Sequence, residues 1–438
     1  MNNQFGSSSL SGPRWLYPPE AASGLRPEGL EIPLPLGRWV RQRFDASHVE
    51  DLRQVVQEQF RQYELAARIP HGGRIAIAVG SRGLARLPEI VAAVAEAVRK
   101  CGAEPFVVPA MGSHGGATAA GQRQILADYG VSESALGIEV RASMDVVEVG
   151  RLPSGMPVFF DREAFQADGV IVINRVKPHT CFRGATESGL IKMLTIGLGK
   201  HKGASMLHTV GFPQFSRLLP EAAGLILSRA RVLCGVASIE NAFEDVAALE
   251  VIPAERILQR EPELLRIARE KMGRILLDSC DVLIVDEIGK NISGDGMDPN
   301  VTGRYSEPTM SGAGGLQAQK VVVLRLTPES HGNASGIGVA DIITQRAFEE
   351  IDFVSTYTNA VTSTVLSSVR IPVVVPTARQ AAALALLTVN GTTPEKARVV
   401  RITNTLQLER IWVSESLWQE IAARPEFEAL TEPYPLEL

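Results

Sequence analysis

The residues from Asn174 to His208 hold many side chains that can transfer protons or bind metal. Three of the seven histidines of the chain, His179, His201 and His208, lie in this window. His201 and His208 are seven residues apart, so they can share one face of a helix. Imidazole titrates near neutral pH and ligates metals when neutral, which favours acid–base or metal chemistry. The plain alternative, a basic solvated loop and helix, explains Lys200 and Lys202, which we expect at the surface or beside a phosphate.

Lys192 does not fit this plain alternative. It lies within the apolar run LIKMLTIGL, where an unpaired ammonium group would be costly to bury. Lysine shifts its protonation easily when it is buried, and buried lysines therefore often have chemical roles.

Two further loops have the composition of an anion site. Gly112–Thr118 (GSHGGAT) joins glycines, hydroxyls and His114 just before an expected helix, and free N–H groups at a helix start favour phosphate. An ordinary strand-to-helix turn explains this loop about as well. The other loop, Ser81-Arg82-Gly83, brings a cation to the end of a short apolar run.

Alternating strands and helices are predicted to position these loops. Strands are expected at 33–39, 74–79, 105–109, 169–173, 280–286, 320–326, 371–375 and 397–402, and helical segments at 47–67, 87–100, 120–129, 188–208, 254–274 and 378–389. This order predicts an α/β fold of two Rossmann-like lobes with mainly parallel sheets. Ligands of such sheets bind at the carboxyl ends of the strands, so we expect an active-site cleft between the lobes.

The length of 438 residues suits two domains. We expect a flexible N-terminal arm at 1–30, a cofactor-binding α/β domain at 31–275 and a C-terminal α/β domain at 276–438. The net charge of −5 argues against nucleic acid or an anionic membrane as the main partner. The four cysteines are widely spaced, without a disulfide or zinc pattern. No signal peptide or membrane-spanning run is evident, which predicts a cytoplasmic protein.

Five motifs in order resemble the nickel-dependent lactate racemase family. They are Arg82 after the first strand of the βαβ unit, Gly112-Ser113-His114, Pro178-His179, Ser188-Gly189-Leu190-Ile191-Lys192, and His208, sixteen residues beyond Lys192. The resemblance covers roughly the first half of the chain.

The resemblance implies a racemase or epimerase of a 2-hydroxy acid that uses a nickel-pincer nucleotide, made by separate cofactor-synthesis enzymes. Lys192 would hold this cofactor covalently and His208 would ligate the nickel. His114 and His179 would be the paired acid–base groups, one for each face of a planar 2-keto intermediate. Ser81, Arg82, Gly112 and Ser113 would bind cofactor phosphate, and Arg82 would also bind the substrate carboxylate together with Lys177, Asp298 and Asn300. Hydride removal suits such substrates because their α-hydrogen is poorly acidic.

Two departures from the family pattern point to a substrate other than lactate. The spacing from His179 to Lys192 is longer than in the lactate enzymes. The second-lobe Gln-x-x-Lys that follows Asp-x-Asn in that family is absent after Asp298-Pro299-Asn300, with Lys290 and Arg304 as possible substitutes. Two other functions therefore stay open: a homologue that binds nucleotide or anion without catalysis, and a zinc-dependent hydrolase or lyase using His179, His201 and His208.

Overall fold

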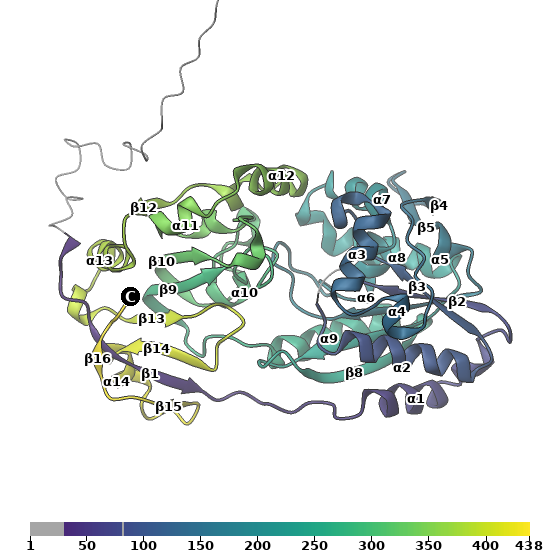
Figure 1. The fold of residues 1–438 in the computed structure, drawn as a ribbon, viewed down its shortest axis with the longest axis horizontal. Helices are drawn as coiled ribbons and strands as arrows, with labels where there is room; N and C mark the ends of the chain where they lie inside the picture. Colours follow the sequence, from purple (N-terminus) through teal and green to yellow (C-terminus); the bar gives the residue numbers. More distant parts are fainter. Residues whose placement is uncertain (1–29, 81–82) are drawn as a thin grey trace, which may run out of the picture. The chain divides into compact units, whose positions relative to one another are not determined.

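A computed structural model describes residues 30–80 and 83–438. The chain forms two compact units, each with its own sheet (Figure 1). The N-terminal unit comprises Phe44–Arg274 and Glu307–Ala313, and the C-terminal unit comprises 30–43, Ile275–Ser306 and Gly314–Leu438. Sheets of mainly parallel strands covered by helices confirm the predicted α/β class. The expected flexible arm falls largely on residues outside the described ranges, as do Ser81 and Arg82.

Five strands form the sheet of the N-terminal unit. In sheet order they are β3 (Glu104–Pro109), β2 (Arg74–Val79), β6 (Gly169–Arg175), β7 (Val232–Glu240) and β8 (Val246–Pro253). The first four run parallel, and β8 pairs antiparallel with β7. A separate hairpin joins β4 (Val146–Arg151) to β5 (Pro157–Asp161). The carboxyl ends of β2, β3 and β6 therefore lie at one edge and carry the loops predicted to be functional.

Helices cover both faces of this sheet. One face packs on α1 (Leu52–Gln62) and α2 (Leu87–Lys100), whose apolar residues join those of the strands in one core. The other face packs on α6 (Leu190–Lys192) and α9 (Ile257–Lys271). Gly235 in β7 leaves room for this close packing, because a Cβ there would lie 2.3 Å from the Leu190 side chain. The other helices are α3 (Ala119–Asp128), α4 (Glu133–Leu136), α5 (Arg162–Phe165), α7 (Lys200–His208) and α8 (Phe215–Arg229).

The C-terminal unit is built on a nine-stranded sheet. Its parallel part runs in the order β12 (Val373–Val375), β11 (Ile342–Thr344), β10 (Gln317–Leu326), β9 (Ser279–Ile288) and β13 (Val399–Ile402). The antiparallel part continues with β14 (Arg410–Ser414), β1 (Leu36–Gln42) and β15 (Phe427–Ala429), while β16 (Tyr434–Pro435) pairs with β1. The helices are α10 (Pro299–Thr302), α11 (Gln345–Glu349), α12 (Phe353–Ser363), α13 (Ala378–Thr388) and α14 (Glu415–Ile421).

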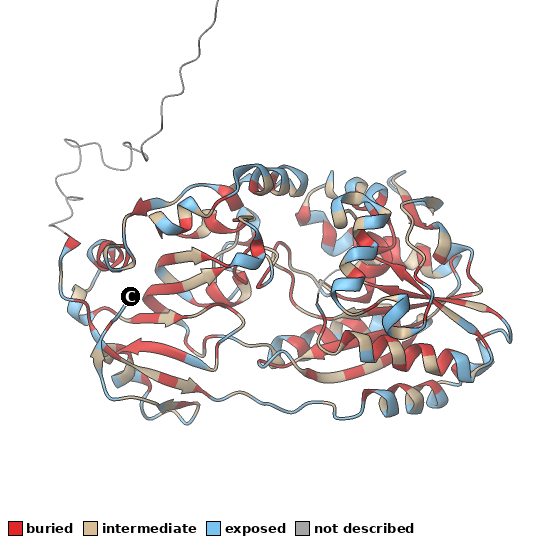
Figure 2. Cartoon of the chain, viewed as in Figure 1, coloured by how far each residue is buried: buried red, intermediate tan, exposed pale blue. Residues whose placement is uncertain are grey.

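The alanine-rich helix α13 supplies much of the core of this unit. Its small side chains pack on the apolar rows of β9, β10 and β13. Figure 2 shows the result in both units: the strands are mostly buried, and exposed residues gather on the outer sides of the helices. Within the described part of the chain, no helix has the length and apolar character needed to cross a bilayer.

Strand β1 differs from the sequence expectation in its partners. The expected domain boundary puts residues 31–43 in the N-terminal domain, but β1 pairs with β14 and β15 in the C-terminal sheet. A strand pairs where its edge and side chains fit, and strand pairing across this distance leaves no signal in local periodicity.

Candidate functional site

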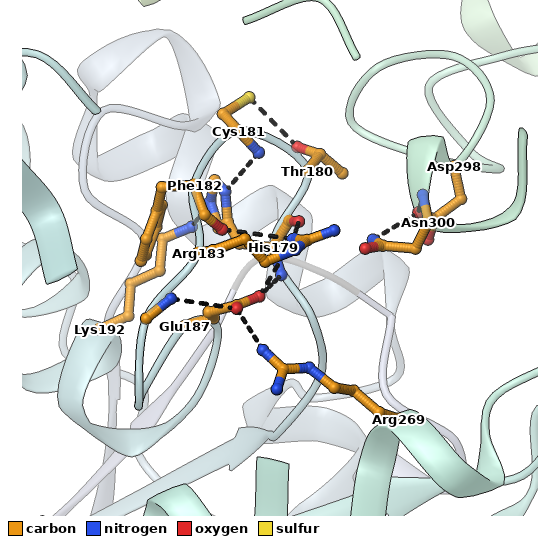
Figure 3. A network of polar contacts seen from close by, with 11 residues as sticks. His179, Thr180, Cys181, Phe182, Arg183, Glu187, Lys192, Arg269, Asp298 and Asn300 are labelled. Carbon is orange, nitrogen blue, oxygen red and sulfur yellow. Dashed lines mark hydrogen bonds and ion pairs between the residues drawn. The ribbon is translucent and has the colours of Figure 1, made fainter. Parts of the chain in front are cut away.

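A loop at the carboxyl end of β6 carries the Pro-His motif. It leaves the sheet after Arg175 and returns at Ser188. The backbone amides of Lys177 and Ser188 donate to each other's carbonyl groups, at 3.0 and 3.2 Å. These paired bonds close the base of the loop, so His179 and Lys192 project from neighbouring stems although they are thirteen residues apart (Figure 3).

The imidazole of His179 is buried and fixed from several sides. Its Nδ1 accepts a hydrogen bond from the backbone N–H of Cys181 at 2.9 Å. The ring packs against Phe182, with 4.5 Å between centroids, and more distantly against Phe212. Because Nδ1 is an acceptor, the neutral ring carries its proton on Nε2.

Glu187 holds the loop that presents His179. Its side chain is fully buried and accepts from the backbone N–H of His179 at 2.6 Å (Figure 3). Arg183 and Arg269 both form ion pairs with this carboxylate, at 3.3 and 2.5 Å. A buried carboxylate needs such partners to offset the loss of its hydration, so this network rigidifies the loop.

The Ser-Gly-x-x-Lys motif opens a helical segment that runs from Leu190 to His208. The segment comprises α6, a π-helical stretch at Met193–Gly197, and α7. Short π-helical stretches often occur at functional sites. Lys192 ends α6, and its Nζ lies 2.5 Å from Nε2 of His179. Since Nε2 carries the ring proton, this contact is satisfied when Lys192 is a neutral amine with a free electron pair, which is the nucleophilic form.

His208 ends the same helical segment and lies among aromatic rings. Its centroid is 5.4 Å from that of Phe212 and 5.3 Å from that of Phe215. Burial, and secondly the charge of Lys192, lower the pKa of His208 to about 4. Burial is the larger cause, so the imidazole is neutral at physiological pH whether or not Lys192 is charged. Neutral imidazole is the form that binds Ni(II).

The glycine-rich loop that carries His114 is tied to this helical segment. The backbone N–H of Gly112 donates to Gly197 O in the π-helical stretch, at 3.0 Å. The buried side chain of Gln122 in α3 donates to the carbonyl oxygens of Gly112 and His114, at 3.0 and 3.2 Å. Gly112 has a φ of +58°, a conformation that favours glycine. The loop therefore has a defined backbone beside the Lys192 segment.

The prediction that Lys200 lies at the surface is wrong. Its side chain is fully buried and forms an ion pair with the buried Asp161 at 3.1 Å. Its Nζ also donates to Pro109 O and to Gln122 Oε1. Burial lowers the pKa of Lys200 and raises that of Asp161, and each partner opposes the shift of the other. Lys200 thus braces the Gln122 amide behind the His114 loop, whereas Lys202 is exposed, as expected, and lies over Phe159.

The predicted substrate residues differ in their surroundings. Lys177 is close enough to Glu244 to lower the pKa of that carboxyl, although burial raises it overall. Asp298 and Asn300 belong to the C-terminal unit, where the Asp298 carboxylate caps α10 and accepts from the backbone and side-chain nitrogens of Asn300, at 2.9 and 2.8 Å. This geometry matches an Asx turn, the structural alternative for the loop, so their role in substrate binding stays a prediction.

The two possible substitutes for the absent Gln-x-x-Lys have structural contacts. Arg304 donates to the carbonyl oxygens of Ala318 and Gln319 and pairs with Asp341 at 2.9 Å. Lys290 donates to Gly294 O at 2.6 Å. These contacts hold the second-lobe loop in place.

The zinc hypothesis finds no ligand set in residues 30–80 and 83–438, where no group of three or more His, Cys, Asp or Glu could hold a metal ion. His201 is exposed and lies 3.5 Å from Ser205 Oγ.

Sequence reasoning missed the residues that support the site: Gln122, Asp161, Glu187, Glu261 and Arg269. Only Glu187, next to the Ser-Gly-x-x-Lys motif, had a local signal.

Comparison with known proteins identifies the segment that carries these groups. Residues 40–214 match the family model described as the lactate racemase N-terminal domain. These residues are thus similar to the N-terminal domain of lactate racemase. Within this lactate racemase domain lie His114, His179, Lys192 and His208, whereas Asp298 and Asn300 lie beyond it. The predicted family resemblance is thereby confirmed.

One solved structure is similar to this chain over most of its length. The lactate racemase apoprotein from Thermoanaerobacterium thermosaccharolyticum is similar over 84% of this chain and 94% of that chain, with 11% sequence identity and a TM-score of 0.49. A search of curated proteins found no match.

Proposed function

We propose that the protein is a racemase or epimerase of a 2-hydroxy acid and that it works with a nickel-pincer nucleotide. The observation that carries the proposal is that Lys192, His179 and His208 lie together inside the lactate racemase domain, with Phe212 against both histidine rings. A reactive amine, a proton carrier and a neutral metal ligand are the three groups that this chemistry requires of the protein.

The residues fit this cofactor in two respects. His208 offers one neutral imidazole, and the described residues hold no larger ligand cluster, so a metal bound there needs other ligands from an organic group. Lys192 presents its amine at Nε2 of His179 and could hold the organic group covalently. The chemistry that the cofactor supplies when bound is reversible acceptance of the substrate α-hydrogen as hydride.

The side chains of this chain have the remaining tasks. His179 and His114 move the hydroxyl proton of the substrate, one histidine for each enantiomer. The glycine-rich backbone at Gly112 and Ser113 binds phosphate, together with Ser81 and Arg82. Arg82 and Lys177 neutralise the substrate carboxylate, and Asp298 and Asn300 contact its polar groups. The phenylalanines around His208 exclude water from this part of the site.

The decisive experiment follows racemisation in D2O with cofactor-loaded protein and a panel of 2-hydroxy acids. Chiral chromatography measures inversion, and mass spectrometry measures deuterium at the α-carbon. Hydride return predicts inversion without deuterium uptake, and loss of inversion in Lys192→Ala. Inversion with deuterium uptake would mean proton abstraction and would contradict the proposal.

The contacts of Arg304 favour one second candidate, a homologue that binds the nucleotide without catalysis. This arginine is engaged by Asp341 and two carbonyl oxygens, so it is poorly placed to replace the absent Gln-x-x-Lys. Such a protein would retain the nucleotide by intact mass but would invert no member of the panel.

A further inference from the structure

Helix α9 supports both stems of the site although it carries none of the proposed reacting groups. Two of its charged residues, Glu261 and Arg269, lie about two helical turns apart and reach these stems. Arg269 reaches the Glu187 carboxylate that holds the backbone of His179. Glu261 reaches the start of α6, the helix that ends in Lys192.

The carboxylate of Glu261 fixes the point at which the Lys192 helix begins. It is fully buried, and its Oε2 accepts from the backbone N–H of Ile191 at 3.0 Å. The backbone N–H of Leu190 lies close enough to lower the pKa of this carboxyl as well, while the buried Oε1 has no hydrogen-bond partner among the described residues. The first N–H groups of a helix have no partner within the helix, so an acceptor placed here determines where the helix starts.

Gly189 makes this approach possible. A Cβ on Gly189 would lie 2.5 Å from the carboxyl carbon of Glu261, which is closer than any real side chain can be. The Gly189 carbonyl is held as well, by Asn174 Nδ2 at 2.8 Å and by Met193 N at 3.1 Å. The glycine of the Ser-Gly-x-x-Lys motif therefore serves a close contact with a carboxylate 72 positions further along the chain.

The start of the helix decides where Lys192 points. Successive residues of an α-helix are turned by about 100°. A start displaced by one residue would swing the Lys192 side chain away from His179, and a shift of the Glu187 loop would move His179 away from Lys192. The contact of 2.5 Å therefore depends on both anchors on α9.

We propose that Glu261 and Arg269 are positioning residues, which use α9 as a common support to hold the Lys192 amine against Nε2 of His179. The proposal deepens the proposed function, because it explains how the protein prepares Lys192 before any cofactor is bound.

Burial of the Glu261 carboxylate lowers the stability of the folded state at neutral pH. This cost favours a role for Glu261 other than stabilising the fold. Burial raises the pKa of Glu261 to about 7, and the N–H groups of Ile191 and Leu190 oppose this shift only in part. A carboxyl with a raised pKa in the folded state contributes less stability as pH rises from its ordinary value through 7. A neutral glutamine would avoid this loss.

Most charged side chains of the elements packed around Glu261 have polar partners of their own. In α9 the pairs are Arg260 with Glu250 and Glu263, Arg269 with Glu187, Arg266 with Glu270, and Lys271 with Asp45. In the neighbouring elements, Lys192 contacts His179, Arg217 pairs with Glu221 and Glu240 pairs with Arg175, and Arg229 at the end of α8 is a further, exposed cation. Burial and backbone N–H groups therefore dominate the titration of Glu261.

The test uses full-length apoprotein, so it needs neither cofactor nor substrate. Glu261→Gln and Arg269→Gln are compared with Glu270→Gln and Arg266→Gln, which break an exposed ion pair on the same helix. A water-soluble amine-reactive ester labels Lys192, and peptide mass spectrometry gives the ratio of its rates at pH 7.5 and pH 10, with exposed Lys100 as reference. Amide hydrogen exchange of a peptide spanning 188–194 and thermal unfolding at pH 8.5 are measured in parallel.

We expect both α9 variants to lower the Lys192 rate ratio at least tenfold and the two controls to leave it unchanged. Glu261→Gln should also speed exchange of the 188–194 peptide while its Tm at pH 8.5 equals or exceeds that of the wild type, which a merely structural residue would not allow. An unchanged rate ratio in Glu261→Gln and Arg269→Gln overturns the proposal. If Glu261→Gln does not fold, the same ratio of Lys192 labelling rates is measured in Glu261→Asp, whose shorter side chain withdraws the carboxylate from Ile191. An unchanged ratio in that variant overturns the proposal. Failure to racemise any 2-hydroxy acid would contradict the proposed function. The labelling, hydrogen-exchange and unfolding measurements on the apoprotein would still test the positioning role of Glu261 and Arg269.

Discussion

The Nζ atom of Lys192 lies 2.5 Å from Nε2 of His179, while the other ring nitrogen of His179 accepts the N–H of Cys181. One backbone hydrogen bond thus sets the tautomer of the ring and, through the ring, the state of the amine. This relation links two motifs of the lactate racemase domain that are separate in the sequence.

His179→Phe should make Lys192 less reactive. The new ring can still pack against Phe182 and Phe212, but it has no Nε2–H to donate to the amine, so the nucleophilic form loses the hydrogen bond that favours it. We expect the labelling of Lys192 at pH 7.5 to slow at least tenfold, measured by peptide mass spectrometry. His201→Phe, at an exposed histidine in α7, is the control, and equal labelling in both variants would refute the assigned tautomer.

The sequence predicted the elements with strong local patterns. The strand at 74–79 and the helix at 87–100 agree with β2 and α2, because each combines a regular apolar period with clear end signals. Lys192 also stood out correctly, since a lysine within an apolar run requires an explanation. Strands β7 and β8 escaped notice because Gly235 and Glu250 interrupt their apolar runs.

The supports of the site could not be predicted because they join distant parts of the chain. Glu187 and Arg269 are 82 positions apart, and Glu261 and Ile191 are 70 apart. Nothing near Lys200 indicates burial either, since its neighbours His201 and Lys202 are exposed. Its partner Asp161 comes from a hairpin that local periodicity did not reveal. Such pairings depend on tertiary packing, which a single sequence does not record.

His208 should make the folded state lose stability in acid. Its folded pKa of about 4 lies below the ordinary 6.5, so its contribution is fully present above pH 6.5 and is lost as pH falls through this window. This difference between the folded and the ordinary pKa corresponds to roughly 3 kcal/mol. We expect urea unfolding between pH 7 and pH 4.5 to show a smaller loss of stability in His208→Phe than in the wild type. His48→Phe, at an exposed histidine, should behave like the wild type, and equal losses in His208→Phe and wild type would contradict the assignment.

Lys200→Met should destabilise the N-terminal unit strongly. It leaves the Asp161 carboxylate buried without its cation, for which about 3–5 kcal/mol is expected. The loss should be smaller at pH 5 than at pH 8, because burial raises the pKa of Asp161 and its protonation relieves the unpaired charge. Denaturant unfolding at the two pH values measures the effect.

A double-mutant cycle separates the buried pair from simple loss of packing. Asp161→Asn retains the Oδ1 atom that accepts from Ala164 N at 2.8 Å, so the cap of α5 survives. The double variant Lys200→Met/Asp161→Asn should lose less stability than the two single variants together, because neither charge remains. Strict additivity would show that the two side chains do not interact.

Gly37→Ala tests whether β1 belongs to the sheet of the C-terminal unit. A Cβ at this position would lie 2.3 Å from both the Trp412 ring and Val413 O on β14, so an alanine must push the two strands apart. Overpacking of this kind costs roughly 1–3 kcal/mol. Trp39, Trp412 and Trp418 all lie in this unit, so thermal unfolding followed by tryptophan fluorescence should show a lower Tm. Gly224→Ala in α8, where the nearest atom would be 3.8 Å away, should leave this transition unchanged. A wild-type Tm in Gly37→Ala would mean that β1 does not pair with β14 in solution.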